Sequence, residues 1–187
     1  MDELIERLRR ARIGATFNFY RDGAGAAARR ERLLRYLRAR EDAPLLLVGE
    51  AAGHRGARVS GVPFTSERQL TGTGPAEATA TIVRRTLAEL GLEEQTLCWN
   101  VVPTHPHLPG RPDTNRRPTR AEVAAARPFL RELARGRDVL AVGRLAEAAL
   151  DAPYVRHPSH GGAAEFRAGL LRFRVGGRRV RRFSVTT

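Results

Sequence analysis

Lysine is absent from this chain of 187 residues, and cysteine occurs only once. A single thiol, Cys98, allows no intramolecular disulfide, no four-cysteine zinc site and no iron–sulfur cluster held by this chain's own cysteines. We therefore expect a reducing, cytoplasmic location. Without lysine, the amino terminus of the chain is the one amine that could form a Schiff base with a sugar.

Long apolar runs are also missing. No apolar stretch approaches the roughly 20 residues that a membrane-spanning helix needs. Residues 1–12 are charged and amphipathic, unlike the apolar core of a secretory leader. We therefore expect no membrane partner and one domain over residues 1–187, with N-terminal helices in 2–40, a core in about 44–173 and a basic tail in 174–187.

Positive charge is abundant, because the net charge is +13 and every cationic side chain apart from histidine is arginine. Such an excess favours a polyanionic partner, with nucleic acid first and an anionic membrane surface a distant second. Arginine also suits bidentate contacts with phosphate. Codon bias would explain the missing lysine but not the excess of basic over acidic residues.

Apolar periodicity predicts helices and strands in alternation. Helices are expected over 2–12, 26–40, 75–90, 119–134, just after 143 to 150, and 163–173, and strands over 45–48, 96–102, 138–143 and 153–156. This order predicts an α/β fold in three layers, in which a central four-stranded, mostly parallel sheet is covered by helices on both faces.

The stretch that begins at Leu45 is the one around which we expect the rest of the chain to be arranged. The apolar run Leu45–Val48 reads as a buried strand that ends at Gly49, and Glu50 follows in a loop rich in glycine. Open α/β sheets place their chemistry at the carboxyl ends of the strands. An ordinary turn with a solvated glutamate is the alternative interpretation.

The loops after three of the predicted strands should meet at one edge of the sheet, which would make Glu50, Asn100 and His157 neighbours. Together with Phe64 they would suit a nucleobase. The Asn100 carboxamide can pair with the N3–H and O4 of a pyrimidine, and a phenyl ring can stack on the base. An imidazole can stabilise the charge of a departing base, so the set fits cleavage of an N-glycosidic bond.

Four segments resemble the uracil-DNA glycosylase superfamily, especially its GEAPG-type branch. Gly49-Glu-Ala-Ala-Gly53 resembles the first motif and His157-Pro-Ser159 the second. Gly61-Val-Pro-Phe-Thr65 is similar to the segment with the stacking phenylalanine, and Trp99-Asn-Val-Val-Pro103 to the strand whose asparagine reads uracil. Order and spacing also match, so the resemblance spans about residues 45–170.

The resemblance implies catalytic roles for Glu50, which would act on the water or the sugar, and for His157, which would stabilise the leaving oxygen. Phe64 would stack on the base, Asn100 would select it, and backbone amides near the first motif would hold it. The implied base-binding residues are Ala51, Gly53, His54, Phe64 and Asn100. This chemistry needs neither a metal nor a cofactor.

The sequence departs from the branch at several positions. Cys98 alone cannot supply the four cysteines of that branch's iron–sulfur cluster, Ala52 replaces the proline of the first motif, and His160 stands where proline is frequent. The bulky residue that excludes thymine in the best-known branch corresponds to Gly53, so any exclusion of thymine must come from elsewhere.

DNA contacts are expected from the basic loop after residue 103 and from the second motif. The candidates are Arg111, Arg116, Arg117, Arg120, Ser159, His160 and Arg167. The tail arginines of 178–182 would either contact phosphates or stay solvated. Members of the superfamily press a side chain into the duplex from the segment after the second motif, and here Phe166 and Arg167 are the options.

His105 and His107 leave alternatives open. Metal binding is disfavoured because no third ligand stands at an obvious spacing. One small branch of the superfamily traps the sugar covalently through a loop histidine, and either residue sits in the comparable region. A noncatalytic DNA-binding module, a glycosylase for another deaminated base such as hypoxanthine, and a nucleoside hydrolase are further alternatives, the last disfavoured by the charge.

The sequence therefore predicts a monomeric, monofunctional DNA glycosylase of base excision repair that flips uracil out of DNA and leaves an abasic site. Monofunctional cleavage follows from the missing lysine.

Overall fold

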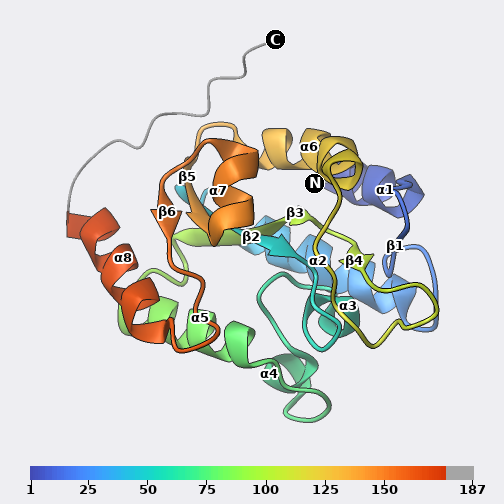
Figure 1. Ribbon diagram of the computed structural model, residues 1–187, viewed down its shortest axis with the longest axis horizontal. Helices are drawn as coiled ribbons and strands as arrows, with labels where there is room; N and C mark the ends of the chain where they lie inside the picture. The colour runs from blue at the N-terminus through green and yellow to red at the C-terminus, as the bar shows by residue number, and fades with distance from the viewer. Residues whose placement is uncertain (176–187) are drawn as a thin grey trace.

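A parallel four-stranded sheet forms the middle layer of the computed structural model, which describes residues 1–175 (Figure 1). The strands are β2 (Leu45–Ala51), β3 (Thr96–Val102), β5 (Asp138–Val142) and β6 (Tyr154–Val155), in the order β3-β2-β5-β6. All three pairings are parallel, which confirms the predicted α/β sheet. The strand of the first motif, β2, lies in the interior of the sheet between β3 and β5.

Side chains alternate between the two faces of the sheet, as the two-residue period of a strand requires. Leu46 and Val48 point into one buried cluster, whereas Leu45 and Leu47 point into the other. Both faces of β2 are therefore buried, which explains its unbroken apolar run.

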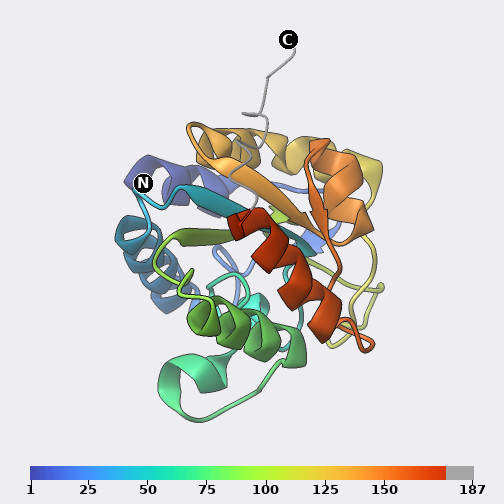
Figure 2. The same cartoon turned by 90° about the vertical axis from the view of Figure 1, so that its left-hand side faces the viewer.

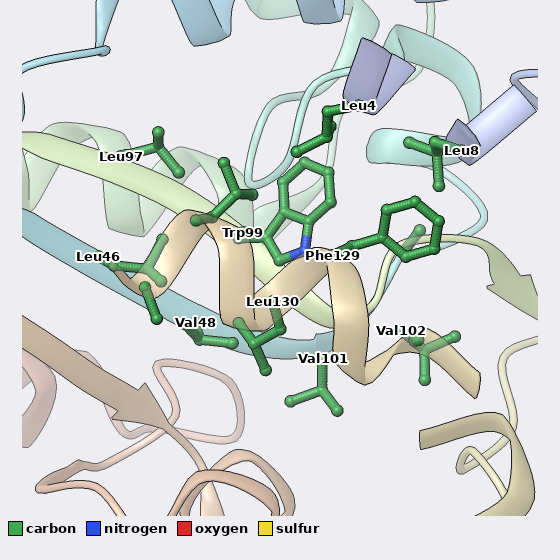
Figure 3. Packing of buried hydrophobic residues seen from close by; sticks show 14 of the residues in the cluster. Leu4, Leu8, Leu46, Val48, Leu97, Trp99, Val101, Val102, Phe129 and Leu130 are labelled. Carbon is green, nitrogen blue, oxygen red and sulfur yellow. The ribbon is translucent and has the colours of Figure 1, made fainter. Parts of the chain in front are cut away.

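Helices cover both faces of the sheet (Figure 2). The first cluster receives side chains from α1 (Asp2–Arg10), α6 (Arg120–Ala134) and α7 (Arg144–Leu150), and the second from α5 (Ala78–Glu89) and α8 (Ala163–Val175). Figure 3 shows the first cluster, where the Trp99 indole packs beside Leu4, Phe129 and Leu130.

The helix α2 (Ala26–Ala39) protects the edge strand β3, because Tyr36 accepts a hydrogen bond from the backbone amide of Cys98 at 2.7 Å. Two short helices, α3 (Ala57–Ser60) and α4 (Glu67–Thr71), follow β2. A second, two-stranded sheet pairs β1 (Thr16–Phe17) with β4 (His105–Pro106) in antiparallel fashion, and this sheet was not predicted.

Most element boundaries fall close to their predicted positions. The capping box at the start of α6 is present, because the Thr119 side chain accepts from the amide of Glu122 and the Glu122 carboxylate accepts from the amide of Thr119. The helix expected from residue 75 begins only at Ala78, since Glu77 is still extended. No helix within residues 1–175 is both long and apolar enough to cross a membrane. The basic segment 178–182 lies outside the described residues.

The central strand gives a stability prediction. Leu46 is fully buried on β2, whereas Leu70 on α4 is 41% exposed. We expect Leu46→Ala to lower the free energy of unfolding by about 2–5 kcal/mol, because it leaves a cavity in the core. The matched change Leu70→Ala should alter it by less than about 0.5 kcal/mol. Urea denaturation followed by circular dichroism measures both, and equal effects would contradict the assigned core.

Candidate functional site

A cavity of about 290 Å³ opens at the carboxyl end of β2 and β3. Its walls come from segments that lie far apart in the sequence, as the convergence of parallel strands requires. The side chains predicted to meet do so here. They are joined by Glu77, which was not among the predicted site residues, and by Arg116, which was predicted to contact DNA. The polar and aromatic lining includes Glu50, Phe64, Glu77, Asn100, Arg116 and His157.

Gly49 makes room for two of these side chains. It pairs in register with Asn100 on β3, and a Cβ atom added to it would overlap the Phe64 ring and lie 3.0 Å from Oδ1 of Asn100. Phe64 itself has a φ of 50°, a strained backbone conformation for a bulky residue. An aromatic face and a carboxamide are thus held together over a strand residue that has no side chain.

Asn100 is nearly buried, and no protein group within residues 1–175 forms a hydrogen bond with its carboxamide. Buried polar side chains normally have such a partner. Because the carboxamide lines the cavity, it can offer a donor and an acceptor together to a ligand.

Glu50 is the penultimate residue of β2, within the strand and not in the loop expected to follow it, and its half-buried side chain lines the cavity. Burial raises the pKa of its carboxyl group above the ordinary value, and the positive charge of Arg117 opposes that shift. Its raised pKa and its position in the cavity are typical of a group that handles protons, so the fully solvated alternative does not hold.

His157 is held as a neutral imidazole. Its Nδ1 atom accepts a hydrogen bond from the backbone N–H of Ser159 at 3.2 Å and lies 2.8 Å from the Ser159 hydroxyl. An atom that accepts from a backbone amide carries no proton, so the proton of the neutral ring is on Nε2. Burial, with the nearby charges of His160 and Arg156, lowers the pKa of His157. The ring can therefore donate from Nε2 without being a cation.

Glu77 was not among the predicted site residues. It precedes α5, a position that in sequence reads as an ordinary helix start, yet its side chain forms no cap. It lines the cavity instead, and burial raises the pKa of its carboxyl group. No regular spacing in the sequence connects residue 77 with the first motif, so only the three-dimensional fold shows that the Glu77 side chain lines this cavity.

The arginines of the basic loop fall into two groups, according to whether they are paired with an acidic side chain. Arg116 forms a bidentate pair with the buried carboxylate of Glu122, at 2.6 and 2.8 Å, so its charge is already compensated. The expected phosphate contact by Arg116 therefore has a competing partner that the sequence did not reveal. In contrast, Arg111, Arg117 and Arg120 are exposed and form no ion pair with any acid in residues 1–175.

Other predicted residues also have their own partners. The backbone amide of His54 donates to Oδ1 of Asn115 at 3.0 Å, so this amide is not free to hold a base. Arg167 lies 3.6 Å from Glu89 in an exposed ion pair. Phe166 is fully buried in the core and cannot enter a duplex, so that option for the inserted side chain is wrong.

The two loop histidines differ in exposure. His105 is fully buried, and its ring nitrogens lie 2.8 Å from the carbonyl oxygen of Ala52 and 3.1 Å from that of Pro112. His105 thus ties the loop to the first motif and is not placed to attack a sugar. His107 is partly exposed beside it. No cluster of three potential metal ligands occurs within residues 1–175.

A family model described as the uracil DNA glycosylase superfamily matches residues 38–176, which includes every strand of the main sheet. The chain belongs to the uracil-DNA glycosylase superfamily. No curated protein sequence matches this superfamily member closely enough to indicate a relative. The crystal structure of wild-type SMUG2 from Pedobacter heparinus is similar in fold, with a TM-score of 0.63 and 15% sequence identity over 92% of this chain and 94% of that chain.

Membership in the superfamily supports DNA glycosylase chemistry in base excision repair, and the cavity lies on the matched region. The first and second motifs contribute Glu50 and His157 to its walls, and the strand between them contributes Asn100.

The tautomer of His157 is directly measurable. We expect nitrogen-15 NMR of histidine-labelled protein to show His157 as the Nε2–H tautomer, with a pKa below the ordinary value of about 6.5. The urea-unfolded protein is the control, since its histidines have neither the Ser159 amide nor the burial. A proton on Nδ1, or a charged ring at pH 7, would contradict the geometry described above.

Proposed function

We propose that this protein is a monofunctional DNA glycosylase that flips uracil out of DNA and releases it by hydrolysis, leaving an abasic site. The observation that carries the proposal is the free Asn100 carboxamide next to the Phe64 ring at one cavity wall. A cavity of about 290 Å³ accommodates a single base but not a stacked duplex, so the base has to leave the helix before it can bind.

Recognition uses Asn100 and Phe64. The carboxamide donates to O4 and accepts from N3–H of uracil, a pattern that cytosine does not present because its N3 is an acceptor and its C4 carries an amino group. Phe64 stacks on the ring of the flipped base. Backbone amides of Ala51 and Gly53 at the end of the first motif supply further donors.

Cleavage of the N-glycosidic bond leaves negative charge on the base and positive charge on the sugar. His157 stabilises the first charge and Glu50 the second. As the bond between N1 and C1′ breaks, its electron pair moves to the base, and the Nε2–H of His157 stabilises the negative charge at O2. Glu50 stabilises the cationic sugar and orients a water whose oxygen bonds to C1′ and whose proton passes to the carboxylate. Glu50 has to be ionised for this step, and the charge of Arg117 favours that form.

The product is an intact strand with an abasic site. A strand-cutting glycosylase uses an amine to attack C1′, and no side chain of this chain supplies one. We propose that the protein acts as a monomer without a cofactor and that its exposed arginines bind the DNA backbone.

The test uses labelled oligonucleotides with one uracil, single-stranded and paired with guanine or adenine, followed by alkali and a denaturing gel. We expect strand cleavage only after alkali treatment. Cleavage without alkali would contradict monofunctional action. A shifted band that survives denaturation would instead indicate covalent trapping, for which His107 is the exposed candidate, and no product with uracil but product with hypoxanthine would change the base assigned.

Asn100→Ala tests the recognition step. Removing a carboxamide that pairs with the base leaves uracil's N3–H and O4 unpaired, so we expect release to slow by about 10²-fold or more while affinity for undamaged DNA is unchanged. Gln95→Ala, an exposed amide at the opposite end of β3, is the control. Single-turnover kinetics and a fluorescence binding titration separate the two effects. Uracil release by Asn100→Ala at the wild-type rate would contradict the role of Asn100 in recognising the base.

Arg117→Ala combined with Arg120→Ala tests the phosphate contacts. We expect the slope of log affinity against log salt to become shallower by about 0.9 for each phosphate that the variant no longer neutralises. Arg135→Ala is the control, because this exposed arginine ends α6 just before β5 and thus lies at the other edge of the sheet. An unchanged slope in the double variant would remove both residues from the DNA footprint.

A further inference from the structure

The carboxyl group of Glu77 fills space that two glycines of the first-motif loop leave open. A Cβ atom added to Gly53 would overlap Oε1 of Glu77, and one added to Gly56 would overlap Oε2. Neither glycine has a positive φ. At both positions a side chain would compete with the Glu77 carboxyl group for the same space, and Glu77 occupies the position that a side chain at residue 53 would take.

This carboxyl group has no partner of its own. Within residues 1–175 it forms neither a hydrogen bond nor an ion pair, and α5 receives no cap from it. Burial alone raises the pKa of Glu77, with no donor or cation to offset it. The carboxyl group is only partly buried, so water still reaches it. A ligand that covers it without supplying a hydrogen-bond donor would remove that water at a cost, whereas a ligand with a donor would replace it.

The position of Glu77 relative to the base rests on the proposed function. Asn100 on β3 would bind N3–H and O4 of the base, and His157 after β6 would bind O2. Because β3 and β6 are the two edge strands of the sheet, these side chains would contact the base from opposite sides. N1 carries the sugar, which Glu50 would face, and C6 is its neighbour. C5 is then the remaining position of the ring, and the remaining carboxyl group of the cavity lining is that of Glu77, beside the loop that follows β2.

We propose that Glu77 determines which substituent the base can carry at C5. It excludes the methyl group of thymine and admits hydrogen or a substituent that donates a hydrogen bond. A methyl group would fill the remaining space and remove water from the carboxyl group without offering a hydrogen bond. A hydroxymethyl group would instead donate a hydrogen bond to the carboxyl group.

The experiment compares three bases that differ only at C5. Duplexes with uracil, thymine or 5-hydroxymethyluracil opposite guanine are incubated with wild type, Glu77→Ala, Glu77→Leu and the exposed control Glu3→Ala. Base release and DNA affinity are measured in parallel. All variants should melt no lower than wild type, because each replaces either a partly buried carboxyl group that has no partner within residues 1–175 or an exposed one.

We expect wild type and Glu3→Ala to release uracil and 5-hydroxymethyluracil but not thymine. Glu77→Ala opens room for a methyl group, so release of thymine relative to uracil should rise by about tenfold or more. Glu77→Leu keeps the bulk without the acceptor, so thymine should stay excluded and 5-hydroxymethyluracil should be released about tenfold more slowly relative to uracil.

The outcomes separate the two proposals. Uracil release by wild type with the same thymine discrimination in Glu77→Ala overturns the role of Glu77 and leaves the proposed function in place. If wild type releases no uracil, the proposed function fails. In that case the role of Glu77 stands only if affinity still distinguishes uracil from thymine duplexes and Glu77→Ala abolishes the difference, and it fails otherwise.

Discussion

The site depends on the absence of a side chain at Gly49. This residue lies inside the central strand, where glycine costs about 0.5–1 kcal/mol relative to alanine. In return, the Phe64 ring and the Asn100 carboxamide can meet directly above the strand. Phe64 adds a strained backbone, of order 1–3 kcal/mol. The buried clusters on both faces of β2 hold this arrangement in place, so the stability of the sheet offsets the strain of the site.

The charged side chains beside the cavity and the carboxyl groups inside it have opposite signs. The exposed Arg117 lies close enough to the cavity for its charge to act on Glu50, and the cavity contains two carboxyl groups, Glu50 and Glu77. Cations at the rim suit the phosphates of a duplex, whereas acids inside suit a sugar that becomes positive. The neutral imidazole of His157 completes this separation, because it donates a hydrogen bond without adding a positive charge next to the forming cation.

The strands and the meeting of Glu50, Asn100 and His157 were predictable, because buried parallel strands have a strong apolar signal and their carboxyl ends must converge. Contacts between loops were not. Glu77 reads as an ordinary residue before a helix, and Arg116 reads as one more cation in a basic loop, although Glu122 neutralises it. His105 was one of two candidates for trapping the sugar, but it is buried and its ring nitrogens lie beside two carbonyl oxygens. The partners of Arg116 and His105, and the two glycines beside Glu77, lie in other segments, and the apolar periodicity of the sequence does not specify how those segments lie relative to one another.

The most direct test is a crystal structure of the protein with a duplex that carries an uncleavable uracil nucleotide, in which carbon replaces the nitrogen bonded to the sugar. We expect the base outside the helix and inside the cavity, stacked on Phe64, with its N3–H and O4 edge on the Asn100 carboxamide. A base that remains stacked in the duplex, or one that binds with a different edge toward Asn100, would contradict the proposed recognition of uracil.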